Sequence, residues 1–518
     1  MQRSDPLPRW ALLLERHATM LVVGLTLLAL AVRLVPALSW PLWHDEAETW
    51  LASRASATAF LNWLAHPVHP PLSFALVRLS TEILGTDAVW ALRLPAVLAG
   101  ALAVPAAYHV GKLGLSRRFG VGFAGLLAVS PTLVLQGRTA RMYPIVVLAA
   151  LVTFACLLRL ENRDRPGLGE TLVLGLAFAF AVGSHYLGLA VWLGAILAVL
   201  VHARGHRTWG NPLIRGVALA SLLPAAVLVA GSGPLRWWAG RLANRILPAV
   251  GEGQFARIQN VPVPEVPAEL WPWALAGGAV LAGLVAVGMA GLLRLRDRRP
   301  LLASLLGWTA GLSLPIALAG GLVLILAMRR YLILIEVAIL AGIAAFAFQR
   351  TSRGSFAFGL ALFGLMALVA LDPVHREPWY DVGEVVERVA ERRDGGESVW
   401  YYPCYLRMIG HYHDLPPGPP PWPEWTWRCS PEWYPPAREP ATWLIVGHTF
   451  PDDAGLRAVV ERLEEAYEVA SAYARIDDAL GRYAAVAARF ERGRVELIHP
   501  ARPSLYRTGM GTAVDRGP

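Results

Sequence analysis

Two adjacent carboxylates, Asp45 and Glu46, follow the first long apolar segment of the chain, and Glu48 lies two positions further on. Carboxylates at the end of an apolar span are costly to keep near lipid, so they are candidates for a functional role. A carboxylate within hydrogen-bond reach of a hydroxyl or amine can act as a general base. We therefore take Asp45 and Glu46 as candidate catalytic residues. The alternative is a solvated cluster that simply ends a helix, because an Asp-Glu pair alone is a weak signal.

Two arginine-tyrosine groups occur beside other apolar segments of the chain. If the turn that contains the first group is helical, its two arginines share one face. The planar guanidinium group forms paired, charge-assisted hydrogen bonds with phosphate. The alternative is that these arginines are anchors whose charged ends reach the membrane surface. The predicted phosphate-binding residues are Arg138, Arg141, Tyr143, Arg329, Arg330 and Tyr331.

Histidines occur close to these candidates, and we assign several of them to a substrate pocket. Two or three histidines near carboxylates are able to bind a divalent metal ion. Prolines interrupt the spacing of the histidines in the first long loop, however, which favours hydrogen-bond donors over metal ligands. A divalent cation is therefore the one cofactor that this pattern admits, and metal dependence stays open. The pocket residues are His44, His66, His69, His185 and Tyr186.

The elements that must position these residues are membrane-spanning helices. Hydrophobic residues make up 55% of the chain and charged residues only 16%, so most of the chain is expected to lie in lipid. The net charge of +9 comes from short basic clusters between apolar segments, which fits membrane topology better than nucleic-acid binding. About eleven spans are predicted, near residues 21–38, 92–110, 119–135, 144–160, 171–185, 187–203, 213–231, 271–293, 301–325, 331–349 and 355–371.

The distribution of arginines predicts the orientation of the chain. Arginines precede the first span and recur in alternate loops, so the N-terminus is expected in the cytoplasm. The protein itself is expected in the inner (plasma) membrane of the cell. Because the number of spans is odd, the C-terminal part is expected on the opposite, external side of the membrane. We expect a transmembrane domain, 1–371, with external loops at 39–91 and 232–270, and an external soluble α/β domain, 372–518.

Periodicity predicts several elements of the C-terminal domain. Helices are expected at residues 379–393 and 456–470, and strands at residues 398–402, 441–446 and 495–499. Cys404 and Cys429 lie in this part of the chain, and they are able to pair if the compartment is oxidising. The sequence does not decide whether they do.

The ordered set of motifs resembles a known family, the C-type (GT-C) membrane glycosyltransferases that use polyprenyl-phosphate sugars. The branch is that of the protein O-mannosyltransferases and the aminoarabinose lipid A transferases. The resemblance is clear from Trp43 to about Leu160 and looser as far as Tyr331. The chain departs from the family at Thr139, where a glutamate is frequent, and at Ser73, where an aromatic residue is frequent. The motifs are Asp45-Glu46, His69-Pro70-Pro71-Leu72, Arg93-Leu94-Pro95, Ser130-Pro131, Arg138-x-x-Arg141-x-Tyr143, His185-Tyr186 and Arg330-Tyr331.

The resemblance implies a polytopic α-helical fold with an exported C-terminal domain, and an inverting sugar transfer on the external face of the membrane. Asp45 would deprotonate an acceptor that is a protein, lipid or glycan, and Arg141 and Arg330 would hold the departing phosphate. The implied partners are a polyprenyl-phosphate-sugar donor, an unidentified acceptor and membrane lipids. The alternative is a polytopic transporter or lipid flippase, with Asp45, Arg141 and Arg330 along its path. The sequence names neither the sugar, the acceptor nor the oligomeric state.

Overall fold

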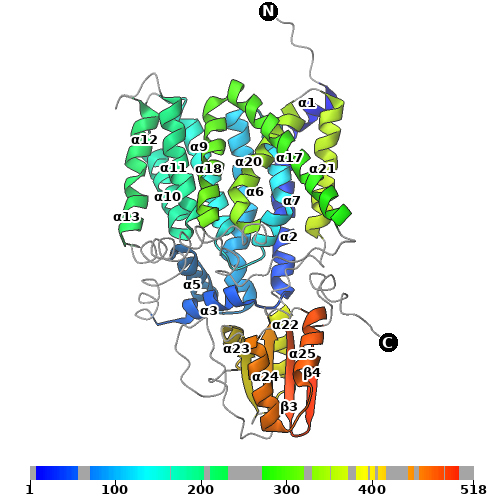
Figure 1. The fold of residues 1–518 in the computed structure, drawn as a ribbon. Helices are drawn as coiled ribbons and strands as arrows, with labels where there is room; N and C mark the ends of the chain where they lie inside the picture. Colours follow the sequence, from blue (N-terminus) through cyan, green and yellow to red (C-terminus); the bar gives the residue numbers. More distant parts are fainter. Residues whose placement is uncertain are drawn as a thin grey trace, which may run out of the picture. The chain divides into compact units, whose positions relative to one another are not determined.

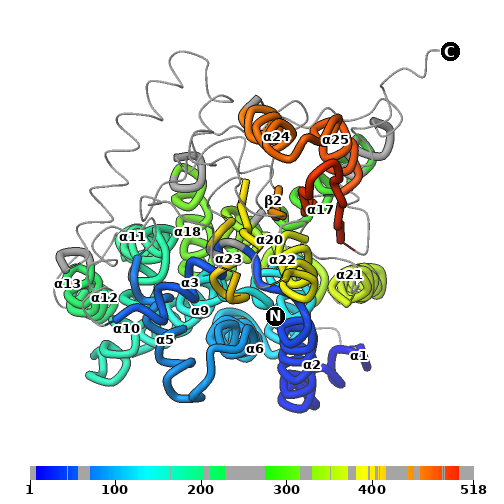
Figure 2. The backbone as a smooth tube through the Cα atoms, turned by 90° about the horizontal axis from the view of Figure 1, so that it is seen from below, coloured from blue at the N-terminus to red at the C-terminus, as the bar shows by residue number. Residues whose placement is uncertain are grey.

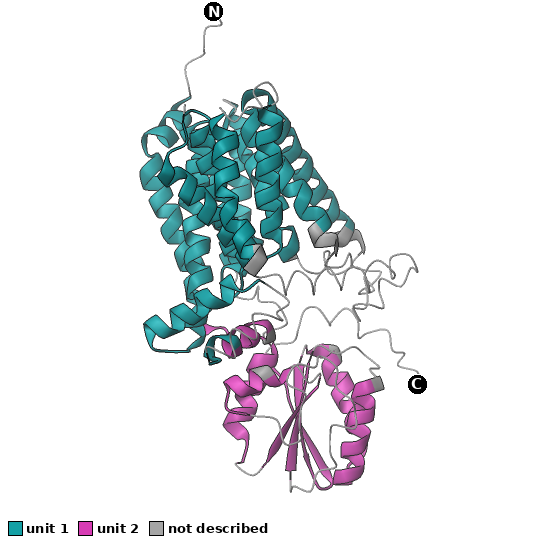
Figure 3. Cartoon of the chain, turned by 90° about the vertical axis from the view of Figure 1, so that its left-hand side faces the viewer, with its two compact units in different colours: residues 1–38, 52–261, 275–375 teal, residues 39–51, 262–274, 376–518 magenta. Residues whose placement is uncertain are grey.

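The computed structural model describes residues 8–56, 70–163, 165–203, 211–230, 271–319, 329–349, 352–371, 381–394, 397–402, 406–415, 441–447, 454–483 and 485–500. The chain forms two compact units (Figure 3). Unit 1 comprises residues 1–38, 52–261 and 275–375, and unit 2 comprises residues 39–51, 262–274 and 376–518. Most of the long apolar helices therefore belong to unit 1.

Within the described ranges, six helices are long and apolar enough to cross a membrane. The chain is therefore a multi-pass membrane protein, as its composition predicts. These helices are α2 (Ala18–Ser39), α6 (Val89–Gly114), α9 (Tyr143–Leu160), α17 (Trp271–Arg298), α20 (Ile333–Gln349), which follows the 3-10 turn η3 (Arg329–Leu332), and α21 (Arg353–Leu371). Further apolar helices are α10 (Leu168–Ser184), α11 (Leu187–His202), α12 (Pro212–Ala220), α13 (Leu222–Ala230) and α18 (Pro300–Ala319). The total of about eleven crossings stays a prediction.

The predicted span 119–135 is divided into two helices, α7 (Arg117–Val129) and α8 (Pro131–Gln136). The break follows from Pro131, because a residue that precedes proline is pushed out of the helical conformation. Ser130 is accordingly extended, and its hydroxyl accepts a hydrogen bond from the Leu133 N–H, which caps α8. The same hydroxyl also contacts the carboxylate of Glu336 in α20. The break thus ties α8 to the helix that follows η3.

The helices of unit 1 lie side by side in a bundle (Figures 1 and 2). Helix α6 packs against α7 and α9, α11 packs against α18, and α20 packs against α7. In Figure 2, α10, α12 and α13 gather at one side of the bundle, and α1 (Arg9–Arg16) and α2 at the other. Glycine and alanine at such contacts let helix backbones approach closely in lipid.

The crossing of α17 and α20 gives a test of this close packing. A Cβ atom added at Gly291 would collide with the backbone carbonyl of Gly342, whereas nothing lies within 4 Å of such an atom at Gly283 of the same helix. We expect Gly291→Val to lower the free energy of unfolding by about 1–3 kcal/mol, the usual cost of overpacking. Gly283→Val is the matched control and should leave the thermal unfolding midpoint in detergent almost unchanged. Equal midpoints for the two variants would contradict the close crossing.

Unit 2 is built around one four-stranded sheet in the order β1 (Ser398–Tyr402), β2 (Ala441–Gly447), β3 (Ala485–Glu491), β4 (Arg494–Ile498). Strands β1 and β2 are parallel, and the other two pairs are antiparallel. Helices α24 (Ala454–Tyr467) and α25 (Ala472–Arg482) cover one face of the sheet through a cluster that includes Trp400, Leu444 and Phe490. Helix α22 (Asp381–Arg392) contacts the sheet at β2, β3 and β4, and Figure 3 shows helices on both sides.

The described elements confirm every helix and strand that periodicity predicts for this part of the chain. Three elements were missed: α23 (Arg407–Tyr412), α25 and β3. Strand β3 contains three alanines among seven residues, and alanine is depleted in strands. Its place between β2 and β4 stabilises it through ladders on both edges, which local sequence does not reveal.

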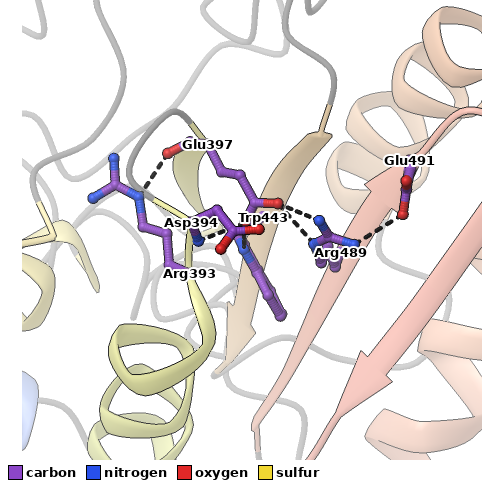
Figure 4. Close-up of polar contacts among 6 residues, drawn as sticks. All are labelled: Arg393, Asp394, Glu397, Trp443, Arg489 and Glu491. Carbon is purple, nitrogen blue, oxygen red and sulfur yellow. Dashed lines mark hydrogen bonds and ion pairs between the residues drawn. The ribbon is translucent and has the colours of Figure 1, made fainter.

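A polar network links the strands of unit 2 around Glu397 (Figure 4). The Trp443 indole N–H donates to the Glu397 carboxylate at 2.6 Å, and Arg489 Nε donates to it at 2.9 Å. Arg489 also pairs with Glu491. Burial alone would raise the pKa of Glu397, but the hydrogen bonds from Arg489 and Trp443 outweigh it, and the net pKa is lowered. Glu397 is therefore ionised and paired in the folded chain.

This network predicts acid sensitivity. Because the pKa of Glu397 is lower in the folded than in the unfolded chain, its stabilisation is present above its ordinary value of 4.5 and is lost as the pH falls through the folded value. We expect Glu397→Gln to cost roughly 1–3 kcal/mol at neutral pH and progressively less as the pH falls below 4.5. Thermal unfolding of wild type and variant across this range measures the difference. If the difference in stability between wild type and variant did not become smaller in acid, the ionised pair would be contradicted.

Candidate functional site

The first candidate group lies at the start of helix α3 (His44–Arg54). Glu46 is fully buried, and its Oε2 atom accepts a hydrogen bond from the Trp43 N–H at 3.4 Å. This is the contact that a glutamate at the third helical position makes in a capping box. Asp45 is half-buried in the same first turn, and its backbone carbonyl accepts from the Thr49 hydroxyl at 3.0 Å. Of the two carboxylates, Asp45 is the more accessible.

The segment that carries Asp45 is held firmly within unit 2. Leu42 and Trp43 are almost completely buried, and Trp50 makes an edge-on contact with Tyr412, with ring centroids 5.3 Å apart. A Cβ atom at Gly383 of α22 would collide with the Leu42 carbonyl, so glycine is required for this approach. The N-terminus of a helix also favours a negatively charged side chain, and Asp45 lies in the first turn of α3.

The second candidate group lies in unit 1, where three segments far apart in the sequence meet. Tyr143 begins α9, His185 links α10 to α11, and Tyr331 lies in η3. The Tyr143 ring centroid lies 5.1 Å from that of His185 and 6.2 Å from that of Tyr331, and His185 lies 6.3 Å from Tyr331. Tyr186 continues the group beside His185. The structure thus brings these four predicted residues together.

Two arginines join this aromatic group. The Arg330 guanidinium carbon lies 5.9 Å from the Tyr143 ring centroid and 5.7 Å from that of Tyr331, within the range of cation–π contacts. Arg141 is only 4% exposed, and both arginines act electrostatically on His185. His185 Nδ1 accepts a hydrogen bond from the Leu187 N–H at 3.0 Å, which leaves Nε2 to carry the proton of a neutral ring. The cluster combines positive charge with aromatic surface.

Arg138 is placed differently from Arg141. The chain from Gly137 to Met142 forms turns and bends rather than a helix, so the two arginines do not share a helix face. Arg138 Nε donates to the Val32 carbonyl at 2.9 Å and Nη2 donates to the Ala370 carbonyl at 2.5 Å. The hydroxyl of Thr139, at the position where the family frequently has glutamate, donates to the Gln136 carbonyl.

Several predicted residues lie outside the described part of the chain. These are His66, His69, Cys404, Cys429, the loop 232–270, and the side chains of His44 and Arg329. Within the residues that are described, no group of three or more His, Cys, Asp or Glu side chains is arranged to hold a metal ion.

Sequence reasoning gave no role to two further polar residues of unit 1. Glu336 contacts Ser130 across 206 positions of sequence, and Arg33 is fully buried within the first span. An ionisable residue inside an apolar helix is itself a signal of function or of a specific packing role, so both were detectable in principle.

The comparisons with known proteins address the same region. Residues 68–230 match the family model of the dolichyl-phosphate-mannose-protein mannosyltransferases. This segment contains Arg138, Arg141, Tyr143, His185 and Tyr186. The resemblance that the motifs predict is therefore confirmed over this part of the chain.

Similar curated proteins include Protein O-mannosyl-transferase 1 of Mus musculus, which is 27% identical over 166 residues, and that of Danio rerio, which is 28% identical over 162 residues. Each alignment covers 30% of this chain and 22% of the relative, so the match spans about a fifth of those proteins. Among solved structures, ArnT from Cupriavidus metallidurans is 16% identical, with 83% of this chain and 93% of that chain covered and a TM-score of 0.47. The Archaeoglobus fulgidus oligosaccharyltransferase is 15% identical, with 76% of this chain and 63% of that chain covered and a TM-score of 0.48.

Proposed function

We propose that this protein transfers one sugar from a polyprenyl-phosphate carrier to an acceptor on the external face of the membrane. The observation that carries the proposal is the cluster of Arg141, Arg330, Tyr143, His185 and Tyr331 in unit 1. All five residues belong to the sequence motifs that carry the family resemblance. Positive charge inside a membrane domain suits a lipid-linked phosphate, because guanidinium groups form charge-assisted hydrogen bonds with phosphate oxygens.

In the proposed reaction, Asp45 takes a proton from the acceptor hydroxyl or amine. The acceptor atom then forms a bond to the anomeric carbon of the donor, while the bond from that carbon to the phosphate oxygen breaks. The electron pair of the broken bond stays on the polyprenyl phosphate. Attack opposite the leaving group inverts the anomeric configuration. The proton ends on Asp45 and is released to solvent.

The roles of the arginines follow from the charge that develops in this step. The departing phosphate gains negative charge, and Arg141 and Arg330 would stabilise it through charge-assisted hydrogen bonds. Preorganised cationic groups of this kind lower the barrier without any rearrangement during the reaction. The phenol of Tyr143 and the Nε2 proton of His185 are further donors in the same cluster. Glu46 accepts a hydrogen bond from the Trp43 N–H at the start of α3, so we assign it a structural role and assign the chemical role to Asp45.

A direct assay tests the proposal. Purified protein in nanodiscs is incubated with bacterial membrane lipid extract, and mass spectrometry follows free polyprenyl phosphate and glycosylated products. The proposal expects both to appear together in a one-to-one ratio. Accumulation of a lipid-linked sugar inside sealed vesicles, without any glycosylated product, would support a flippase instead and reject the transferase.

A further inference from the structure

Three arginines of unit 1 are buried among helix ends and bond to backbone carbonyls. Arg33, Arg93 and Arg138 are at most 3% exposed. Arg33 Nη1 donates to the carbonyls of Ala29 and Ala128, and Arg93 Nη1 donates to that of Ala37 at 3.1 Å. Ala128 and Ala37 lie in the last turns of α7 and α2, where carbonyls have no helical donor. These arginines therefore satisfy acceptors that the helices cannot satisfy themselves.

Arg138 has the most specific acceptors of the three. Pro36 lies inside α2 and has no N–H, so the carbonyl four residues earlier, that of Val32, loses its helical donor. Arg138 Nε donates to this same carbonyl at 2.9 Å. Its Nη2 atom donates to the carbonyl of Ala370, in the last turn of α21. One side chain thus joins the proline break of α2, the end of α21 and the turn from Gly137 to Met142.

The turn from Gly137 to Met142 also packs against a second arginine, Arg33. A Cβ atom at Gly137 would lie 2.6 Å from Arg33 Nε, and one at Gly100 of α6 would lie 2.7 Å from it. Both glycines leave room for the Arg33 side chain, which is fully buried. Within the turn, the Arg141 N–H bonds to the Thr139 carbonyl at 2.8 Å. Two arginines therefore hold the turn that carries Arg141. Arg33 packs against it, and Arg138, which belongs to it, bonds to the carbonyls of α2 and α21.

We propose that Arg138 is a positioning residue that holds the turn bearing Arg141, and that it does not itself bind the donor phosphate. Two of its nitrogens are directed to backbone carbonyls, and its partners are set by Pro36 and by the end of α21. The proposal rests on the proposed function only in that Arg141 is taken to contact the phosphate. It divides the two motif arginines into one that binds the donor and one that orients its neighbour.

A double-mutant cycle between Pro36 and Arg138 tests this role. Pro36→Ala restores an N–H that can bond to the Val32 carbonyl, so Arg138 loses that acceptor. We compare wild type, Pro36→Ala, Arg138→Gln and the double variant. The readouts are the affinity for undecaprenyl phosphate in detergent and the hydrogen–deuterium exchange of the peptide 136–142. Arg138→Lys, which keeps a charged donor, serves as the milder variant if the glutamine variant does not fold.

Positioning predicts that the two substitutions are coupled. Arg138→Gln should weaken binding of undecaprenyl phosphate about tenfold and speed exchange at residues 136–142 in the wild-type background. In the Pro36→Ala background both effects should be clearly smaller. An equal loss of affinity in both backgrounds, with unchanged exchange, would show that Arg138 contacts the phosphate and would overturn the proposal. If wild type has no affinity for undecaprenyl phosphate, the proposed function fails, and the exchange cycle alone decides the positioning role.

Discussion

Replacing Asp45 by asparagine is expected to reduce sugar transfer by about 10²–10⁴-fold, the usual contribution of a general base. The substitution keeps the size and shape of the side chain and removes its ability to take a proton. Asp45 is half-buried in the first turn of α3, and the bond from the Trp43 N–H to Glu46 helps to hold that turn. The loss should therefore appear in the rate of turnover and not in the thermal unfolding midpoint.

Glu46 gives the matched control for Asp45, because it is the adjacent carboxylate in the same turn. Glu46→Ala removes the acceptor for the Trp43 N–H and should cost about 1 kcal/mol of stability, as loss of a helix cap does. Glu46→Gln retains an acceptor oxygen and should be closer to wild type in both stability and turnover. Transfer at the wild-type rate by the Asp45→Asn variant would remove Asp45 as the base. A stronger loss of turnover in Glu46→Gln than in Asp45→Asn would exchange the two roles.

The sequence predicts the elements of this protein better than the partners of individual side chains. Apolar segments and basic loops locate the helices because lipid imposes the same requirement on every span. The break at Ser130 was missed within the predicted span 119–135, although Pro131 is its cause. Strand β3 was missed because its alanines carry little strand signal, and only pairing with β2 and β4 stabilises it.

Arg138 and Arg141 show where prediction from motifs ends. Spacing alone makes them equivalent, because both belong to the same motif. What separates them is a proline more than a hundred positions away, since Pro36 exposes the carbonyl to which Arg138 bonds. Similarly, Tyr143, His185 and Tyr331 come from three segments, and only the packing of α9, α10 and η3 shows that their rings meet. Such long-range contacts leave no local pattern in the sequence.

The second large effect is expected at Arg330. Replacing Arg330 by glutamine should lower the rate of transfer by about 10²–10³-fold, as removal of a group that stabilises developing charge does in other enzymes. Arg330 lies over the rings of Tyr143 and Tyr331, which restrict the orientation of its guanidinium group. Affinity for undecaprenyl phosphate should fall as well, because the product carries the charge that Arg330 stabilises.

The Arg330→Lys variant distinguishes the effect of the positive charge from the effect of the planar guanidinium group. Arg330→Lys retains a positive charge but has neither the planar fork that binds phosphate through two hydrogen bonds nor the flat surface that lies over the rings. We therefore expect it to recover part of the affinity for undecaprenyl phosphate and little of the rate of transfer. Arg117→Gln is the control for a general loss of charge, because Arg117 is an exposed residue at the start of α7. If Arg330→Gln and Arg117→Gln behaved alike, Arg330 would be an ordinary surface cation, and the phosphate would have to bind elsewhere.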